Sequence, residues 1–455
     1  MIDWAPDTID TGKPRYLAIA DAIARDVQSG RLGGGDRLPP QRRLAARLGI
    51  DFTTVSRAYA EAQARGLIAS HVGRGTFVAD RAPAPAEDPE RRRAGDLSMN
   101  MPPEPSDPDL VARMKGGLDY VSANLVDLLR YQAPIGTDRD RTAASSWLSM
   151  RGMVPSMERI AVTPGAHATM AAILSIITRP GDTVLCERVT YPGIRNIAAR
   201  FGVTLIGLDM DAEGVTPEAL SDAIARHRPK ALYLNPTLQN PTTLTIPVDR
   251  RLALAEVLRV EGLTLIEDDA YGFIPAKAPA PIALSAPDLT WHIGGLAKCI
   301  GAGLRLAFTI APSPRCAYRL AQAIRALSVM PSPLSMALTT QWIEDGTADG
   351  IRRFIRAETA ARQAIAREAL EGVEFATAEN AFNIWLTLPK GAGRADIVAR
   401  MAGRQLGIMP SDAFTVAGEP GEKLRVCLGG AVSRDALREN LFFLGNTLAP
   451  NAFMG

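Results

Sequence analysis

Short apolar runs alternate with longer segments of helical apolar spacing through the middle of the chain. The runs predict strands and the longer segments predict helices, with strands at 183–187, 204–208, 231–234 and 263–267 and helices at 194–201, 217–226 and 248–261. This alternation favours an α/β fold with a mostly parallel sheet and right-handed crossovers, which binds cofactors at the carboxyl ends of its strands. From about residue 313 helices dominate, and strands at 381–388 and 424–428 predict a smaller C-terminal α+β domain.

The N-terminal residues show a different pattern, in which three helices precede two short strands. Helical spacing of apolar residues predicts one helix ending at Gly30, a second ending at Gly49 and a third over 53–65. Two short strands, 66–68 and 73–78, then read as a wing. This order of elements predicts a winged helix-turn-helix.

A segment rich in proline and charge separates the two patterns. Residues 81–96 have no periodic apolar face, and alternating alanine and proline stiffen their first part. We therefore expect a winged helix over 1–80, a linker over 81–96, a large domain over 97–330 and a small domain over 331–455.

Composition excludes several classes of protein. The net charge of +2 identifies no partner, and four scattered cysteines argue against a disulfide framework or a metal site. The first residues lack the pattern of a signal peptide, and no apolar run approaches the ~20 residues of a membrane span. The sequence predicts a cytoplasmic protein without a membrane partner.

Charge within the predicted winged helix is strongly basic. Seven arginines lie between Arg37 and Arg74, against two acidic residues, Asp51 and Glu61. A local basic surface attracts nucleic-acid phosphates. A solvated arginine-rich domain that binds protein explains the charge equally well.

One lysine suggests covalent chemistry. Lys298 lies among apolar and small residues after an apolar strand, and Arg305 follows seven residues later. Desolvation lowers a lysine pKa and frees the amine to attack a carbonyl, while a planar guanidinium suits a phosphate. Taken alone, a lysine and an arginine near glycines more often form a solvated loop.

Residues 294–305 resemble the lysine motif of fold-type I pyridoxal phosphate aminotransferases, and 265–271 and 238–242 resemble two upstream motifs of that family. The resemblance implies that Lys298 forms the Schiff base with pyridoxal 5'-phosphate. It also implies this family's fold, with a mostly parallel sheet flanked by helices and a small C-terminal domain.

Three further residues receive roles from this resemblance. Asp268 would pair with the protonated pyridine nitrogen, and Tyr271 and Asn240 would face the phenolic oxygen of the cofactor. Two positions depart from the family: Thr243 stands where glycine is usual, and Ala297 replaces the serine that commonly precedes the lysine.

The resemblance also implies a phosphate cradle. The amides of Ala166 and His167 would begin a helix and hold the phosphate together with Arg305. Tyr191 stands where the family stacks an aromatic ring on the cofactor. Tyr131 would reach the cofactor phosphate of the neighbouring subunit in a homodimer; as an alternative, it is a packed surface tyrosine.

Arg425 is the expected effector residue. In aminotransferases the matching arginine binds the α-carboxylate of the amino acid by a bidentate pair. A surface ion pair is the alternative interpretation. Relatives often carry histidine where this chain has Asn383, which leaves the effector side chain open.

The winged helix resembles the GntR type in motifs at 36–39, 44–49, 54–59, 66–68 and 75–78. In that family, the second helix of the motif enters the major groove of DNA. By position, DNA contacts are expected from Arg42, Thr53, Thr54, Arg57 and Arg74. Phe52 replaces a usual arginine, so the base preference at this position is open.

Over essentially its whole length the chain resembles the MocR subgroup of GntR regulators. The resemblance implies a transcriptional regulator that binds double-stranded operator DNA and senses an amino acid or amine by aldimine exchange at Lys298. The alternative is a catalytically active aminotransferase with an accessory DNA-binding domain. A third possibility is a degenerate body that only dimerises the DNA-binding domains.

Overall fold

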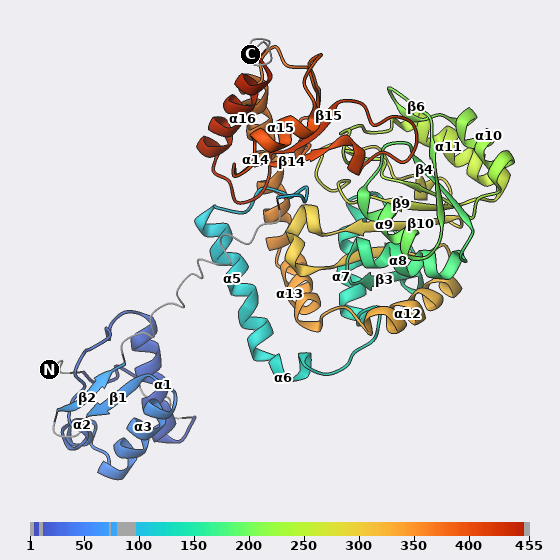
Figure 1. The fold of residues 1–455 in the computed structure, drawn as a ribbon. Coiled ribbons are helices and arrows are strands. Elements are labelled where there is room, and N and C mark those ends of the chain that lie inside the picture. Colours follow the sequence, from blue (N-terminus) through green and yellow to red (C-terminus); the bar gives the residue numbers. More distant parts are fainter. Residues whose placement is uncertain (1–3, 9–11, 72–73, 80–96, 450–455) are drawn as a thin grey trace. The chain divides into compact units, whose positions relative to one another are not determined.

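The computed structural model describes residues 4–8, 12–71, 74–79 and 97–449. The chain divides into two compact units, Met1–Ala94 and Gly95–Gly455 (Figure 1). The predicted linker at 81–96 lies outside the described residues. A further boundary near residue 330 stays a prediction.

Three helices and an antiparallel two-stranded wing make up the N-terminal unit. They are α1 (Arg15–Gln28), α2 (Gln41–Leu48), α3 (Phe52–Ala64), β1 (Ile68–His71) and β2 (Gly75–Val78). α2 ends at Gly49, whose φ of 62° lies in the left-handed region that glycine adopts without strain. Asp51 begins α3 because its carboxylate accepts a hydrogen bond from the Thr53 amide at 2.7 Å. The predicted winged helix-turn-helix is confirmed, and α3 begins one residue earlier than expected.

Burial determines which face of α3 points into the core of the N-terminal unit. Val55, Ala58 and Tyr59 pack in the core of the unit, and the Tyr59 hydroxyl donates to the Pro39 carbonyl oxygen at 2.8 Å. The opposite face, with Thr53 and Arg57, is therefore left exposed.

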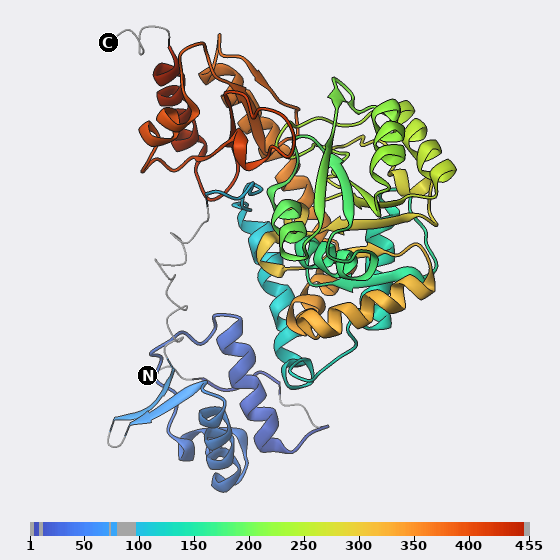
Figure 2. The same ribbon diagram turned by 45° about the vertical axis from the view of Figure 1, so that its right-hand side comes forward.

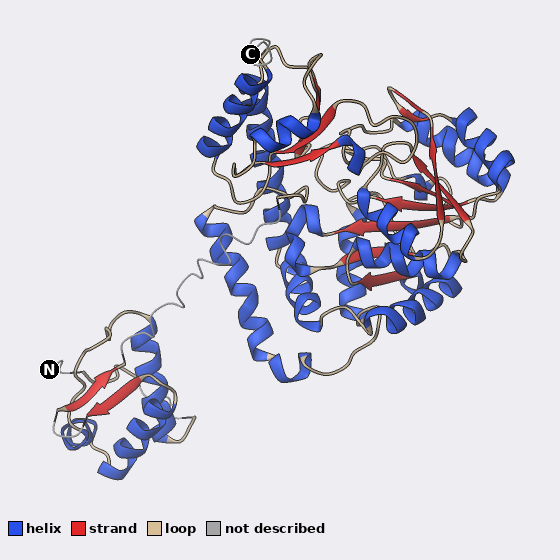
Figure 3. Ribbon diagram, in the orientation of Figure 1, coloured by secondary structure: helices blue, strands red, loops and turns tan. Residues whose placement is uncertain are grey.

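A seven-stranded sheet forms the centre of the larger unit (Figure 3). Its strands are β3 (Ile160–Thr163), β4 (Thr183–Glu187), β5 (Thr204–Leu208), β8 (Ala231–Leu234), β9 (Thr264–Asp268), β10 (Thr290–Gly295) and β11 (Ala307–Ile310). The order is β3-β11-β10-β9-β8-β4-β5, and only β11 runs antiparallel to its neighbours. The predicted α/β class is confirmed.

Helices cover both faces of this sheet (Figure 2). They include α8 (Ala166–Ile177), α9 (Pro192–Arg200), α10 (Pro217–His227), α11 (Val248–Glu261) and α12 (Pro314–Ser328), and a short hairpin, β6 (Met210–Asp211) with β7 (Gly214–Val215), lies between β5 and α10. Successive residues of β9 show the two-sided burial, because Leu265 and Ile266 belong to different apolar clusters. Strands buried on both faces explain the continuous apolar runs in the sequence.

The remaining elements lie before and after the sheet in the chain. They are α5 (Pro108–Ala123), α6 (Leu125–Leu128), α7 (Asp138–Ser149), α13 (Pro333–Glu344), α14 (Thr347–Ala369), β12 (Phe375–Ala376), β13 (Asn383–Thr387), α15 (Arg394–Arg400), β14 (Gly407–Pro410), β15 (Lys423–Cys427) and α16 (Arg434–Leu448). The last four strands form an antiparallel sheet of order β12-β13-β15-β14. Among the described residues, no helix combines the length and apolar character that a membrane crossing requires.

A buried ionic cluster lies just beyond the end of β9. The Asp269 carboxylate accepts from Arg151 Nε at 2.9 Å and lies 3.3 Å from His292 Nε2. Burial alone would raise the pKa of Asp269, but Arg151 and His292 outweigh it and hold the pKa well below its usual range. These paired charges fix the loop that follows Asp268.

Candidate functional site

Lys298 lies on a single π-helical turn, Ala297–Gly301, directly after β10. Its side chain is partly buried, and its amine donates a hydrogen bond to the backbone carbonyl of Asn100. The Nζ atom lies 5.9 Å from the centre of the Tyr271 ring. Burial, the main cause, lowers the Lys298 pKa to about 8. A larger share of this amine is therefore neutral and nucleophilic than in a solvated lysine.

The reactivity of Lys298 should follow this lowered pKa. Mixing the apoprotein with pyridoxal phosphate should give visible absorbance at a rate that rises with pH around a midpoint near 8, because only the neutral amine attacks an aldehyde. Stopped-flow absorbance across neutral and alkaline pH measures the midpoint. A midpoint near the ordinary lysine value of about 10.4 would contradict this prediction.

Asp268 is the last residue of β9, and one of its two carboxylate oxygens already accepts a hydrogen bond. Oδ2 accepts from the Tyr233 hydroxyl at 2.9 Å, whereas Oδ1 is buried and has no hydrogen-bond partner among the described residues. Burial raises the Asp268 pKa to about 6, and the Tyr233 hydrogen bond partly offsets this. A buried carboxylate oxygen without a donor suits a protonated ring nitrogen, so this residue fits the pyridine of pyridoxal phosphate.

Amide side chains from distant segments meet beside Tyr271. Asn100 Nδ2 donates to the Tyr271 hydroxyl at 2.9 Å and to Asn383 Oδ1 at 3.0 Å. Asn383 Nδ2 donates to the carbonyl oxygen of Pro241 at 2.8 Å. Pro241 is the residue that directly follows Asn240 in the sequence. The structure thus brings the predicted Tyr271 and Asn240 into one cluster. Asn100 and Tyr233 were missed by the sequence analysis, because no local motif surrounds either residue.

The structure gives a reason for the unusual Thr243. Its φ is 64°, in the region that glycine adopts freely and a β-branched residue adopts with strain. This finding explains why glycine is usual at this position in the family that the motif resembles. The Thr243 amide still closes the turn by donating to the Gln239 carbonyl.

The predicted phosphate residues lie at the start of α8. Gly165 precedes the helix, and Ala166 and His167 open it, so their amides are unpaired by the helix itself. The Arg305 guanidinium lies close to Gly165. A Cβ atom placed on Gly165 would be only 3.3 Å from Arg305 Nη2. The Tyr191 hydroxyl lies 3.5 Å from His167 Nδ1. Burial and, second, the charge of Arg305 lower the His167 pKa from its ordinary value.

Arg425 belongs to the same site. It is buried on β15, where Nη1 donates to Asn240 Oδ1 at 3.3 Å and Nη2 donates to the Ser98 carbonyl. Its guanidinium carbon lies 5.2 Å from the centre of the Phe414 ring. The surface ion pair considered from the sequence is wrong, because Arg425 is 2% exposed.

Tyr131 follows α6 and is 83% exposed. Within the described part of the chain, no hydrogen bond joins it to the Lys298 cluster. Its placement in a neighbouring subunit's site stays a prediction.

The predicted DNA-contacting residues lie on the exposed parts of the winged helix. Arg42 is on α2, Thr53, Thr54 and Arg57 are on α3, and Arg74 directly precedes β2. All are exposed except Thr54, which is half-buried. Aromatic rings support two of the guanidinium groups, since Arg57 lies 4.2 Å from the centre of the Tyr16 ring and Arg42 lies 5.8 Å from that of Phe52. Phe52 thus packs beneath Arg42.

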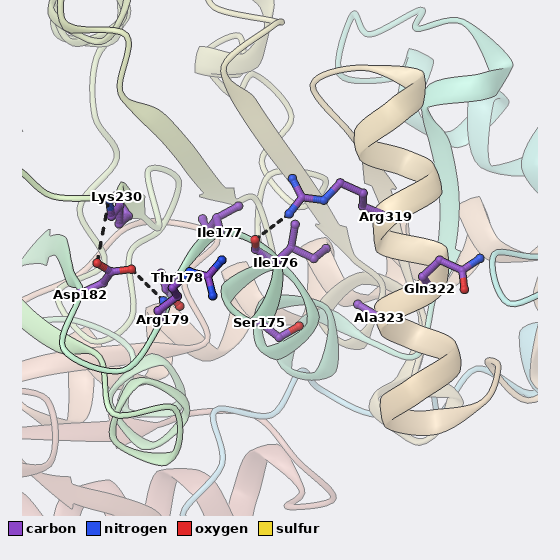
Figure 4. A pocket seen from close by; sticks show the side chains of 10 residues that line it. All are labelled: Ser175, Ile176, Ile177, Thr178, Arg179, Asp182, Lys230, Arg319, Gln322 and Ala323. Atoms are coloured by element: carbon purple, nitrogen blue, oxygen red, sulfur yellow. Dashed lines mark hydrogen bonds and ion pairs between the residues drawn. The ribbon is translucent and has the colours of Figure 1, made fainter.

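A surface hollow of about 690 Å³ lies elsewhere on the larger unit, between the end of α8 and α12 (Figure 4). Asp182 and Lys230 in its wall precede β4 and β8, so the hollow is at the amino ends of these strands. Three of its charged groups contact other groups of the chain, since Lys230 lies 4.0 Å from Asp182 and Arg319 donates to the Ile176 carbonyl. None of its lining residues belongs to the Lys298 cluster.

Fold and site together define the class of this protein: a fold-type I aminotransferase body joined to a winged helix. Residues 96–441 match the aminotransferase class I and II family, and residues 15–78 match bacterial regulatory proteins of the gntR family. The chain belongs to the aminotransferase class I and II family, with the added gntR-family domain that characterises MocR-type regulators. This fold and family indicate pyridoxal phosphate as the cofactor.

Two relatives with regulatory names match most of this chain, and a solved aminotransferase structure matches its larger part. An uncharacterized HTH-type transcriptional regulator, YdeF of Bacillus subtilis (strain 168), is 27% identical over 98% of this chain and 97% of its own length. The probable rhizopine catabolism regulatory protein MocR of Rhizobium meliloti is 25% identical over 86% of this chain and 82% of its own. Among solved structures, the α-aminoadipate aminotransferase LysN of Thermus thermophilus, complexed with N-(5'-phosphopyridoxyl)-L-leucine, has a TM-score of 0.69. It is 23% identical and covers 79% of this chain and 93% of its own, so the likeness concerns the fold.

Proposed function

We propose that this protein is a pyridoxal phosphate-dependent transcriptional regulator that binds operator DNA and senses an amino acid or amine at Lys298. The observation that carries the proposal is the presence, in one chain, of a lysine whose pKa burial lowers, in a site that fits pyridoxal phosphate, and of a winged helix with an exposed basic face. A sensor needs reversible chemistry with its ligand and a separate output domain, and the two units supply these parts.

Each site residue has a task in this proposal. When bound, pyridoxal phosphate supplies an aldehyde carbon that reacts reversibly with primary amines. Lys298 offers, beside Tyr271, an amine that loses its proton more readily than a solvated lysine does, and Asp268 presents its unpaired oxygen to the ring nitrogen. The start of α8, with Arg305 nearby, holds the phosphate charge.

Arg425 gives the effector its expected chemistry. Its buried guanidinium suits a carboxylate, and its contact with Asn240 places that carboxylate next to the cofactor site. An α-amino acid carries both a reactive amine and such a carboxylate. The effector class we propose is therefore an amino acid or a similar amine.

DNA binding should depend on the exposed arginines of α2 and α3. Each of Arg42→Ala and Arg57→Ala should weaken duplex binding and reduce the slope of log affinity against log salt by about one, because one phosphate contact is lost. Fluorescence anisotropy with a duplex selected by the wild-type protein from random DNA measures both effects. Arg259→Ala removes an exposed arginine of α11 in the other unit and serves as the control. Unchanged slopes for both α2 and α3 variants would contradict the assignment.

We also propose a homodimer, which an exposed apolar surface supports. Large apolar side chains on α5, α6 and the following loop are exposed, namely Leu118, Leu125, Val126, Leu129 and Tyr131. These residues lie close together in the sequence, and exposed apolar patches are typical of an interface. A second copy would cover them and bring Tyr131 to the partner's cofactor phosphate. Analytical ultracentrifugation should therefore show a dimer, and a monomer at micromolar concentration would contradict this part.

Aminotransferase turnover is the second candidate function. Lys298, Asp268 and Arg425 are the types of residue that transamination requires, and they lie in one connected site. Incubating the holoprotein with amino donors and 2-oxo acids distinguishes the two functions. Product formed over many turnovers would favour an enzyme, whereas a spectral change without product fits a sensor.

A further inference from the structure

We infer that Asn100 is a positioning residue for the cofactor: its side-chain amide donates to the Tyr271 hydroxyl and thereby directs the Tyr271 proton toward the phenolic oxygen of the cofactor. The inference rests on the proposed cofactor function and deepens it. Asn100 lies on the segment of the larger unit that directly follows the predicted linker. None of the sequence motifs described above lies in this segment.

The orientation of the Asn383 amide is fixed by a backbone carbonyl. The Pro241 carbonyl can only accept, so the group facing it at 2.8 Å must be the NH2 of Asn383. The Asn383 oxygen then points the other way, toward Asn100. The hydrogen bonds therefore identify which end of the Asn383 amide is the oxygen and which is the nitrogen.

The same reasoning fixes Asn100. Because Asn383 Oδ1 can only accept, Asn100 must present its own NH2 there, and this group also reaches the Tyr271 hydroxyl at 2.9 Å. The consequence is visible at the other end of the amide, where Asn100 Oδ1 is buried without a hydrogen-bond partner among the described residues. Asn100 is 3% exposed, so bulk water does not replace the missing hydrogen-bond donor. An arrangement that leaves a buried acceptor unsatisfied favours a functional reason for it.

The Tyr271 hydroxyl has one proton, and this proton is free to be donated to the cofactor. Burial raises the Tyr271 pKa, so the hydroxyl keeps its proton, and Asn100 occupies the oxygen as a donor. No hydrogen bond among the described residues uses the Tyr271 proton. The charged and titratable groups that face this hydroxyl or the Lys298 amine are Asp268 on β9, Arg425 and Cys427 on β15, Arg305, and Lys298 itself. The proton is thus available for the phenolic oxygen.

This orientation has a spectroscopic consequence. In the deprotonated form of the bound chromophore the phenolic oxygen carries its full negative charge, so a donor to that oxygen favours deprotonation. Without Asn100, the Tyr271 hydroxyl can turn away, and the deprotonated form loses part of this stabilisation. The pH midpoint of the visible absorbance should therefore rise.

The test is an absorbance titration of the full-length holoprotein, comparing wild type with Asn100→Ala. We expect the midpoint to rise by about one pH unit, the size of one charge-assisted hydrogen bond. In a Tyr271→Phe background, which lacks the hydroxyl, Asn100→Ala should cause no further shift. Met99→Ala removes an exposed neighbouring side chain of the same segment and should leave the midpoint unchanged.

A second variant covers the possibility that Asn100→Ala does not fold. Asn100→Asp has the same shape but can only accept from Tyr271 when ionised, so it draws the Tyr271 proton away and should also raise the midpoint. Equal midpoints in wild type and both Asn100 variants would overturn the inference while leaving the proposed function intact. A shift that persists undiminished in Tyr271→Phe would also overturn it. A wild-type protein that shows no visible band with pyridoxal phosphate would overturn both.

Discussion

Lys298→Ala should show no visible absorbance band with pyridoxal phosphate beyond that of the free cofactor. Lys298 is the amine that the structure places beside Tyr271, with a pKa lowered by burial to about 8. Its removal leaves the site without a covalent attachment for the aldehyde. We expect complete loss of the protein-dependent band, measured by absorbance after gel filtration, and loss of any effector response.

The control for this variant is another lysine of the same unit. Lys277 is exposed on the loop before β10, so Lys277→Ala should retain the wild-type spectrum. The winged helix of Lys298→Ala is unaltered, and its duplex binding without effector should match wild type. A band of wild-type intensity in Lys298→Ala would show that the cofactor is attached elsewhere.

Asp268→Asn should bind pyridoxal phosphate about 10- to 100-fold more weakly, the size expected for a lost hydrogen bond to a charged group. The variant keeps the shape of the side chain and an acceptor for Tyr233, but it lacks the charge that favours a protonated ring nitrogen. Equilibrium titration of the apoprotein, followed by absorbance or fluorescence, measures the affinity.

The same variant should not destabilise the apoprotein. Burial raises the Asp268 pKa to about 6, above its unfolded value, so the ionised carboxylate costs the folded state stability at higher pH. Removing this charge should leave the free energy of unfolding at about pH 8 unchanged or higher. Asp288→Asn, at an exposed position, controls for the substitution itself. Unchanged cofactor affinity in Asp268→Asn would contradict the role of this carboxylate.

Residues in local motifs could be predicted from the sequence, and residues joined over long distances could not. Asp268 ends one apolar strand and Lys298 follows another, so strand ends placed them at one edge of the sheet, while the family resemblance supplied their roles. Asn100 contacts Tyr271 across 171 residues of sequence, and its segment has no periodic pattern. The pairing of Asp268 with Tyr233 was missed for a related reason, because Tyr233 reads as one more apolar position of a buried strand.

Departures from the family pattern gained physical meaning only with the structure. Thr243 adopts a φ that favours glycine, and Phe52 supports the Arg42 guanidinium at the surface of the winged helix. Neither feature follows from residue types alone, because both depend on backbone conformation or on packing between helices. Asn383, which replaces a common histidine, orients Asn100 through its amide.

The most direct test of the whole account is operator binding measured with and without an amine that changes the visible spectrum of the holoprotein. The duplex is one that the wild-type protein selects from random DNA, and Lys298→Ala is titrated in parallel. The account predicts that such an amine changes the wild-type dissociation constant for the duplex and leaves that of Lys298→Ala unchanged. Equal changes in both proteins, or no sequence-preferring binding by wild type at moderate salt, would contradict it.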